Sequence, residues 1–418
     1  MFKQPSRQAL LCGAALVCGA LSAYAEPDEL ALGKELGYPV APKAFQMYAN
    51  PYRVGSWSAL DQVSNVKVRI VQRPAQPLAL PRVAEPPAIR YRYGFAERGI
   101  ADYLERQRVT GLLVLKNGEI VAEHYRYGRT DDARFLSFSM AKSVTSLLIG
   151  VALDRGVIES LDDPADKYVT SLAGSLYGST TLRQLLRMSS GVTFSERYDG
   201  KDDVARLARA VGGGPESTTE VLRSQSERHS APGQKFAYAS AETEVLGRVL
   251  TSATKRSLAD LTTDWLWKPM GAEHEAFWCI GKDGQEVAYS CFNATLRDWA
   301  RLGLLLANDG RVGAEQVVPR AYLLDATDSL RQPDAFRPRN ATLYYGYGYQ
   351  FWLLPLRERT FVMQGVFGQA VFVQPSSGIV MVVTSVWEEP AGLGTLLVHE
   401  ERDQLWRGVL RSLGGSVD

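Results

Sequence analysis

The sequence contains little histidine and little cysteine, four of each in 418 residues. The histidines, His124, His229, His274 and His399, are scattered, and none stands in an H-E-x-x-H or another paired-ligand spacing. Zinc and similar metals need such clusters of ligands. We therefore expect neither a metal site nor a cofactor.

An excess of charge of either sign is also missing. The chain has 47 basic and 46 acidic residues, which gives a formal net charge of +1. Proteins that bind nucleic acid usually present a basic patch or stripe to the phosphate backbone. We therefore expect no nucleic acid partner.

A hydrophobic run long enough to span a bilayer is absent from the N-terminus. Residues 1–25 carry Lys3 and Arg7, then an apolar run from Ala9 to Leu21, and end on Ala-Tyr-Ala before Glu26. The run is shorter than the ~18 residues that a membrane anchor needs. This pattern predicts a cleaved signal peptide, a mature chain from Glu26 with no stable membrane insertion, and a periplasmic or secreted location.

Cleavage would remove two of the four cysteines and leave Cys279 and Cys291 in an oxidising compartment. They flank Gly281-Lys282-Asp283-Gly284, which is typical of a hairpin turn. The two thiols are therefore expected to face each other, either as a disulfide or as a free buried pair.

The chain of 418 residues exceeds the size of one ordinary core, so we expect a composite architecture. Residues 26–90 lack sustained periodicity and are predicted to form an extended N-terminal arm. A helix is expected over 95–106. Strands over 111–115 and 119–125 are joined by Asn117-Gly118, a strong hairpin signal.

Residues 161–276 alternate short helical patterns with Gly- and Pro-containing turns, and another helix opens near Thr295. The chain then returns to strands, expected over 347–354, 360–365, 369–374 and 379–386. A terminal helix is expected over 393–413. We therefore predict an α/β (α+β) fold, in which an antiparallel sheet built from both ends of the chain is flanked by helices. The main domain would span 91–418, with sheet regions at 91–138 and 290–418 and an inserted mainly helical subdomain at 139–289.

The most informative stretch begins at Ser139. Lys142 is the only charged residue between Phe135 and Leu153, and the apolar residues around it recur at helical spacing up to Gly156, a plausible C′ position. Burial disfavours the charged form of an amine, so Lys142 is expected to accept a proton from the Ser139 hydroxyl on the same helix face. The alternative is that both residues form the polar edge of a helix.

Two further segments carry polar groups next to turns. Tyr238 lies just before a predicted helix, where a nearby lysine would stabilise its phenolate and make it a proton shuttle. The alternative is a core tyrosine, with Ser240 as the helix N-cap. Gly365 permits close backbone approach, so the N–H groups of Val366 and Ser139 are expected to form an oxyanion hole. Alternatively, the glycines near 365 mark a β-bulge.

The order Ser139-x-x-Lys142, Tyr238-x-Ser240, then Gly365 with Gly368-Gln369 resembles the serine β-lactamase-like superfamily. The resemblance is nearest to class C β-lactamases, family VIII esterases and 6-aminohexanoate-dimer hydrolases, and it runs from about Tyr91 to the C-terminus. It implies a β-lactamase/transpeptidase-like fold. It also implies that Ser139 is the acylated nucleophile, Lys142 its base and Tyr238 the residue that passes a proton to the leaving group.

Two departures from the family pattern bear on the substrate. Ser240 replaces the usual Asn of Tyr-x-Asn, and Met363-Gln364-Gly365 replaces the usual Lys/His-Thr-Gly. Ser240, Gln364 and Gly365 thus stand at substrate-binding positions without the amide and the cation of the relatives. Since a charge-assisted hydrogen bond contributes ~1.5–3 kcal/mol, anionic penicillins should bind poorly.

These features favour a serine hydrolase that forms an acyl-enzyme on a small ester or linear amide. A β-lactamase or D,D-peptidase is the alternative, and a non-catalytic binding or sensor module is the second alternative. A Ser-His-Asp hydrolase is disfavoured because no G-x-S-x-G occurs in the chain. The acyl and leaving groups and the oligomeric state are not determined by these patterns.

Overall fold

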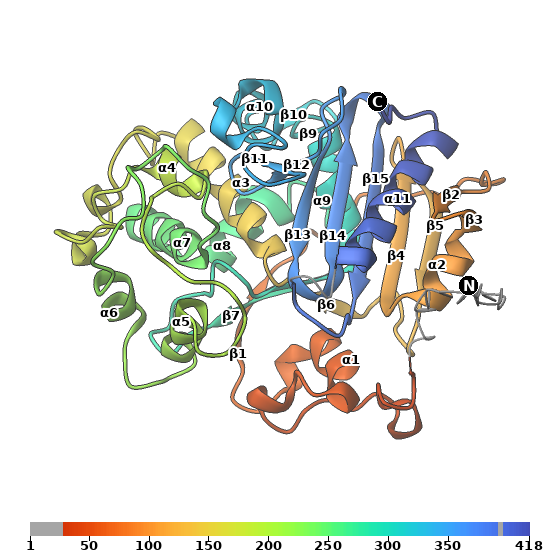
Figure 1. Ribbon diagram of the computed structural model, residues 1–418, viewed down its shortest axis with the longest axis horizontal. Coiled ribbons are helices and arrows are strands. Elements are labelled where there is room, and N and C mark those ends of the chain that lie inside the picture. The colour runs from red at the N-terminus through yellow and green to blue at the C-terminus, as the bar shows by residue number, and fades with distance from the viewer. Residues whose placement is uncertain (1–27, 392–395) are drawn as a thin grey trace, which may run out of the picture.

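The computed structural model describes residues 28–391 and 396–418 (Figure 1). The expected signal peptide lies outside this range. The protein is built on a seven-stranded antiparallel sheet in the order β11-β12-β13-β14-β15-β4-β5. These strands are β4 (Val109–Lys116), β5 (Glu119–Tyr125), β11 (Gly346–Tyr347), β12 (Trp352–Leu353), β13 (Phe361–Gly365), β14 (Gln369–Gln374) and β15 (Ile379–Ser385).

The pairing of β15 with β4 joins the two ends of the chain, with Val380 opposite Leu115 and Val382 opposite Leu113. This confirms the predicted sheet. Side chains alternate between its faces, as strand geometry requires. Leu113 and Leu115 enter the core that contains the central helix, whereas Leu112 and Val114 enter the core beneath the C-terminal helix.

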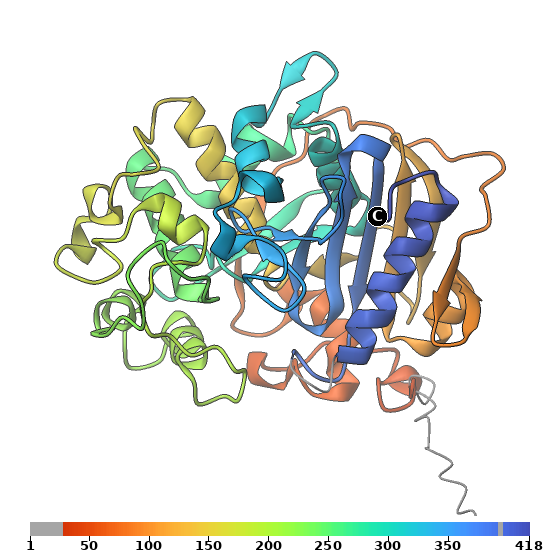
Figure 2. The same ribbon diagram turned by 45° about the horizontal axis from the view of Figure 1, so that its top comes forward.

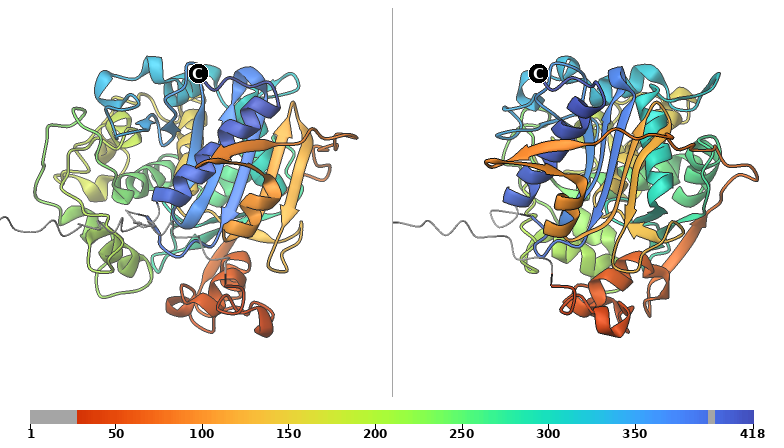
Figure 3. Two further views of the ribbon diagram at one scale, coloured as in Figure 1. Left: turned by 45° about the vertical axis from the view of Figure 1, so that its right-hand side comes forward. Right: turned by 90° about the vertical axis from the view of Figure 1, so that its right-hand side faces the viewer.

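Helices cover both faces of this sheet (Figure 3). One face packs against α9 (Leu296–Ala307), and the other is crossed diagonally by α11 (Leu396–Ser412), as Figure 2 shows. The small hairpin of β2 (Arg90–Tyr93) and β3 (Ala96–Gly99) lies against α11, and α2 (Ile100–Arg106) follows it. Only the second half of the helix predicted over 95–106 is therefore helical, because Ala96–Gly99 pairs with β2.

A helical block lies beside the sheet, on the left of Figure 1. It comprises α3 (Met140–Asp154), α4 (Leu182–Leu186), α5 (Asp203–Val211), α6 (Thr218–Arg223), α7 (Ser240–Thr254) and α8 (Leu258–Thr262). The central helix α3 is buried over Met140–Ala152. Gly156 has a φ of 68°, the left-handed conformation expected of a C′ residue. The predicted end of this helix is thus confirmed.

The prediction of a single sheet is incomplete. A second, four-stranded sheet has the order β1-β7-β8-β6, formed by β1 (Lys67–Val71), β6 (Arg134–Leu136), β7 (Ala276–Ile280) and β8 (Phe292–Thr295). Strand β7 therefore lies within the region predicted to be mainly helical. The remaining α-helices and strands of the described residues are α1 (Asn50–Ser58), α10 (Arg320–Thr327), β9 (Arg311–Val312) and β10 (Glu315–Gln316).

The prediction of an extended arm over 26–90 is wrong for its central part. Helix α1 buries Val54 and Trp57, and β1 pairs with β7 along its whole length. The arm thus belongs to the core, although its sequence shows no long periodic run. The prediction of one continuous strand over 347–354 is also wrong. A turn at Gln350, whose φ is 64°, divides it into two short strands.

Candidate active site

Helix α3 begins directly after Ser139, the candidate nucleophile of the sequence analysis. Strand β6 ends at Leu136, and Phe138 takes the left-handed conformation with a φ of 44°, which turns the chain into the helix. Ser139 is the N-cap residue and is half-buried. The free N–H groups of the first helical turn favour negative charge at this point.

Lys142 lies one turn further along α3, and its side chain is 1 % exposed. Its Nζ lies 2.9 Å from Ser139 Oγ and donates a second hydrogen bond, of 2.8 Å, to the carbonyl oxygen of Tyr289. Burial lowers the pKa of Lys142 to about 8, while the Glu196 carboxylate opposes this shift. An amine with this pKa is partly neutral near pH 7 and can accept a proton from Ser139.

The loop before α7 brings Tyr238 to the same point. Its phenol lies next to the Ser139 side chain, and its ring centroid lies 5.0 Å from Lys142 Nζ. Burial and the nearby Glu196 raise the pKa of Tyr238 well above its ordinary value. The expectation of a stabilised phenolate is therefore wrong for the resting state. The phenol keeps its proton and has one to donate.

Glu196 is the acidic group of this site, and the sequence analysis missed it. Its carboxylate accepts hydrogen bonds from the Ser240 N–H at 2.7 Å, the Ser240 hydroxyl at 2.8 Å and the Tyr198 phenol at 2.8 Å. No local motif marks Glu196, since its contacts with Ser240 come from a residue 44 positions away.

Ser240 lies at the start of α7, one residue beyond the N-cap. Ala239 is the N-cap of α7, and Ser240 is its first helical residue, so the N-cap alternative is wrong. Its side chain is 2 % exposed and binds Glu196. The hydroxyl therefore helps to hold the Glu196 carboxylate in place.

Strand β13 brings the second candidate oxyanion donor to the start of α3. Gly365 packs directly on the carbonyl oxygen of Ser137, and a Cβ atom built at Gly365 would lie 2.3 Å from it. Gly365 keeps regular register opposite Gln369, so the bulge alternative is wrong. The Val366 N–H follows immediately in the chain.

The turn after Val366 is held by one amide side chain. Gln369 Nε2 donates to the carbonyl oxygens of Val366, Phe367 and Ser385, at 3.4, 3.2 and 2.7 Å. Gln364, on the other side of Gly365, accepts a hydrogen bond of 2.6 Å from buried Arg402. Met363 is fully buried and uncharged, so this position does not supply a cation to the site.

Cys279 and Cys291 are joined in a disulfide in this structure. The bond closes the segment between β7 and β8, and this segment contains Tyr289. Since the Tyr289 carbonyl accepts a hydrogen bond from Lys142, the closed segment also helps to fix the amine next to Ser139.

Aromatic side chains form a wall around Tyr238. Trp352 stacks on the Tyr238 ring at 5.5 Å, and Tyr347 and Phe236 complete the group with centroids 4.7 Å apart. Trp352 and Phe236 remain partly exposed. This wall offers an apolar surface next to Tyr238.

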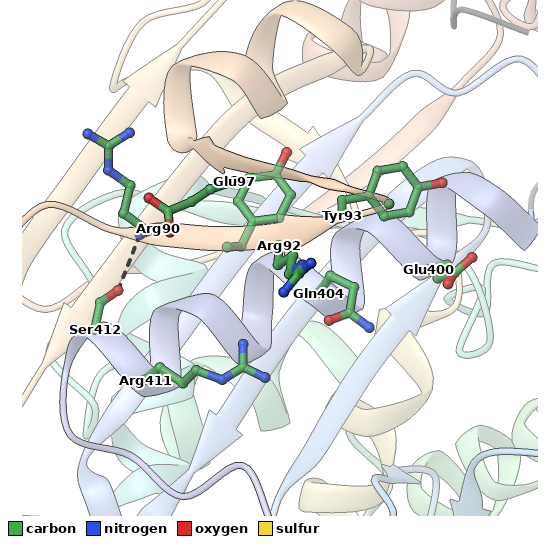
Figure 4. Close-up of a pocket in the computed structure, with 10 residues that line it drawn as sticks. Arg90, Arg92, Tyr93, Glu97, Glu400, Gln404, Arg411 and Ser412 are labelled. Carbon is green, nitrogen blue, oxygen red and sulfur yellow. Dashed lines mark hydrogen bonds between the residues drawn. The ribbon is translucent and has the colours of Figure 1, made fainter. Parts of the chain in front are cut away.

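A cavity lies away from these residues (Figure 4). It has a volume of about 740 Å³ and is formed between the β2–β3 hairpin and α11, with Arg90, Arg92 and Arg411 among its lining. None of the candidate site residues lines it.

Across residues 28–391 and 396–418, no group of three or more His, Cys, Asp or Glu side chains is arranged to hold a metal ion. Within the same residues, no helix is both long and apolar enough to cross a membrane.

The chain is similar to known proteins in both sequence and structure. A sequence model of the family named Beta-lactamase matches residues 96–403. The 6-aminohexanoate-dimer hydrolase of Paenarthrobacter ureafaciens is 27% identical over 297 residues, which cover 69% of this chain and 75% of that protein.

Solved structures share the fold. A Bacillus anthracis protein assigned as a 6-aminohexanoate-dimer hydrolase superposes with a TM-score of 0.79 at 22% identity, covering 91% of this chain and 98% of the other. A family VIII carboxylesterase superposes with a TM-score of 0.57 at 16% identity, covering 75% of this chain and 95% of the other. The antiparallel sheet with flanking helices is thus a β-lactamase/transpeptidase-like fold.

Proposed function

The chain belongs to the Beta-lactamase family of serine hydrolases, and on that basis we propose that it hydrolyses a small ester or linear amide through an acyl-enzyme. The observation that carries the proposal is the 2.9 Å contact between Ser139 Oγ and a buried amine whose pKa is lowered to about 8. A hydroxyl paired with a partly neutral amine is an activated nucleophile.

In the proposed reaction, Lys142 takes the proton of Ser139 as its oxygen attacks the substrate carbonyl. The N–H groups of Ser139 and Val366 stabilise the oxyanion that forms. Tyr238, which keeps its proton at rest, donates to the departing alcohol or amine, and the Lys142 proton replaces the one it gave. A water molecule then attacks the acyl-enzyme, returns its proton through the same groups and releases the acid.

The choice of an ester or linear amide over a penicillin is supported by the surroundings of the nucleophile. Met363 stands where relatives carry a cation, and Ser240, in the position of their Asn, is committed to Glu196. The 27% identity to a hydrolase of a linear amide dimer supports the same substrate class. The partly exposed aromatic wall beside Tyr238 suits an apolar acyl or leaving group.

A periplasmic or secreted location is part of the proposal. It is supported by the signal-like residues 1–25 and by the Cys279–Cys291 disulfide, because structural disulfides persist in oxidising compartments. N-terminal sequencing of the mature protein should begin at Glu26, and cell fractionation should recover it outside the cytoplasm.

The test is a panel of nitrophenyl esters, linear amides and nitrocefin, together with mass spectrometry after a fluorophosphonate. We expect ester or amide turnover, a single phosphonyl adduct on Ser139, and loss of both in Ser139→Ala. Ser179→Ala, an exposed serine of the helical block, should behave as the wild type.

Other outcomes separate the alternatives. Rapid nitrocefin turnover, or a stable penicillin adduct on Ser139 without ester turnover, identifies a β-lactamase or a D,D-peptidase. Binding of substrates without turnover, and without a phosphonyl adduct, identifies a non-catalytic module.

A further inference from the structure

A tryptophan of the N-terminal arm lies between the two segments that supply the candidate oxyanion donors. Trp57, on α1, is 4 % exposed. Its ring lies 4.9 Å from that of Phe138 and 4.8 Å from that of Phe367, and the two phenylalanine rings are 5.2 Å apart. One side chain therefore packs on both segments at once, at the end of the sheet where α1 lies in Figures 1 and 3.

The two phenylalanines share an uncommon backbone conformation. Phe138 has a φ of 44° and precedes Ser139, whereas Phe367 has a φ of 62° and follows Val366. Residues with a Cβ atom rarely adopt this left-handed backbone conformation, because it costs free energy that the surrounding contacts must offset. Phe138 orients the peptide plane that carries the Ser139 N–H. Phe367 shapes the turn that begins at Val366, directly after the peptide plane that carries the Val366 N–H.

Further contacts tie α1 to the same turn. Arg53, one helical turn before Trp57, donates hydrogen bonds to the carbonyl oxygens of Trp387 and Glu388. Its guanidinium lies 5.3 Å from the ring centroids of both Trp57 and Phe367. The Trp387 N–H in turn donates to the Phe367 carbonyl oxygen at 3.2 Å. The arm thus contacts the Phe367 turn through both backbone and rings.

We propose that Trp57 is a positioning residue of the oxyanion hole, which holds Phe138 and Phe367 in their left-handed conformations so that the Ser139 and Val366 N–H groups converge. The proposal rests on the proposed hydrolase function. It assigns a role to a segment that precedes the region matched by the family, residues 96–403. Trp57 itself does not touch the substrate in this role.

The test compares Trp57→Leu with Trp57→Phe in the full chain, since both replace the indole by a smaller apolar side chain but only phenylalanine keeps an aromatic contact. Displacing oxyanion donors by a fraction of an ångström should lower kcat of Trp57→Leu about 10- to 100-fold, with KM within about threefold of the wild type. Trp57→Phe should recover kcat to within about threefold of the wild type. The phosphonylation rate constant at saturating fluorophosphonate should fall with kcat, while its binding constant is preserved.

Two controls separate positioning from stability. Phe45→Ala removes a ring that is 77 % exposed on the same arm, and it should leave kcat unchanged. Trp406→Ala removes a fully buried tryptophan of α11, and it should lower the melting temperature while the folded enzyme keeps its kcat. If Trp57→Leu is folded and retains wild-type kcat and phosphonylation rate, or changes KM alone, the proposal is overturned.

Failure of the underlying function gives a different pattern. If the wild type turns over no ester or amide and Ser139 is not phosphonylated, the hydrolase proposal fails and this inference fails with it. If the wild type is active and Trp57→Phe is as slow as Trp57→Leu, the inference alone fails, because the aromatic contact is then not what positions the donors.

Discussion

At the scale of single residues, the site depends on two charges held close together. Lys142 is buried and has its pKa lowered to about 8, and the Glu196 carboxylate acts on the same amine in the opposite direction. Desolvation is the larger effect, so the amine can lose its proton near neutral pH. The balance between these two effects sets the pH range in which Ser139 is activated.

The acylation rate should therefore rise with pH through a pKa of about 8. Only the neutral amine accepts the Ser139 proton, and at pH 7 roughly one tenth of it is neutral, so the rate should fall about tenfold for each pH unit below that. Stopped-flow release of nitrophenol between about pH 6 and 9.5 measures the profile. A rate that is flat or that falls over this range would contradict the role of Lys142.

Replacing the acidic neighbour should shift this profile. Glu196→Gln removes the charge that raises the Lys142 pKa, so the midpoint of the acid limb should move to lower pH. The matched control is Glu105→Gln, an exposed residue of α2, which should leave the midpoint where it is in the wild type. An unchanged midpoint in Glu196→Gln, measured with the same ester, would show that the carboxylate does not act on the amine.

At the scale of elements, local patterns predicted the structure where short-range physics decides it. Asn117 and Gly118 both have positive φ, as the predicted hairpin requires, and α3 ends where Gly156 allows. Long-range contacts decided others. The strand expected over 347–354 is interrupted because Gln350 bonds to Leu185 and Leu186 of the helical block. Ala96–Gly99 is a different case, since it pairs with β2 in a local hairpin that the helical pattern over 95–106 did not indicate.

The same distinction applies to the candidate site. Ser139, Lys142 and Tyr238 were found because they occur in short motifs with a fixed spacing, and the structure brings them together. Glu196 and Trp57 stand in no such motif. They reach the site only through contacts with segments far along the chain, at Ser240 for the first and at Phe138 and Phe367 for the second.

Helix α9 offers a test of capping at this scale. The Thr295 hydroxyl accepts the Asp298 N–H, and α9 packs on β4, β14 and β15. Loss of an N-cap costs about 1 kcal/mol, so Thr295→Ala should lower the free energy of unfolding by about that amount without changing kcat. Urea unfolding measures this, and Thr295→Ser, which keeps the hydroxyl, should be close to the wild type. A loss of kcat in a folded Thr295→Ala would contradict the purely structural role.

At the scale of the whole molecule, two cores share one sheet. The core on the α3 and α9 face carries the candidate site, while the core on the other face packs α11 against β14 and β15. Because β4 and β15 are neighbours, the sheet is complete only when both ends of the chain have folded. Contacts such as that of Trp406 with Phe372 therefore lie away from the site, whereas Arg402 of the same helix donates a hydrogen bond to Gln364.

Trp406 tests this separation. Its indole is fully buried and stacks on Phe372 with ring centroids 5.3 Å apart. Trp406→Ala should lower the free energy of unfolding by about 3–5 kcal/mol, as large-to-small changes in a core do. Kinetics at a temperature well below the transition should give wild-type kcat per folded molecule. A large drop in kcat under those conditions would mean that the two cores are coupled.

The position of Trp57 has a practical consequence for dissecting or redesigning this protein. A fragment trimmed to the boundaries of the family match would keep every reactive side chain, yet it would uncover two phenylalanine rings and leave β7 without its neighbour β1. Mutant libraries aimed at faster turnover should for the same reason include the arm, since substitutions there reach the reaction through the backbone and leave the substrate's own contacts intact.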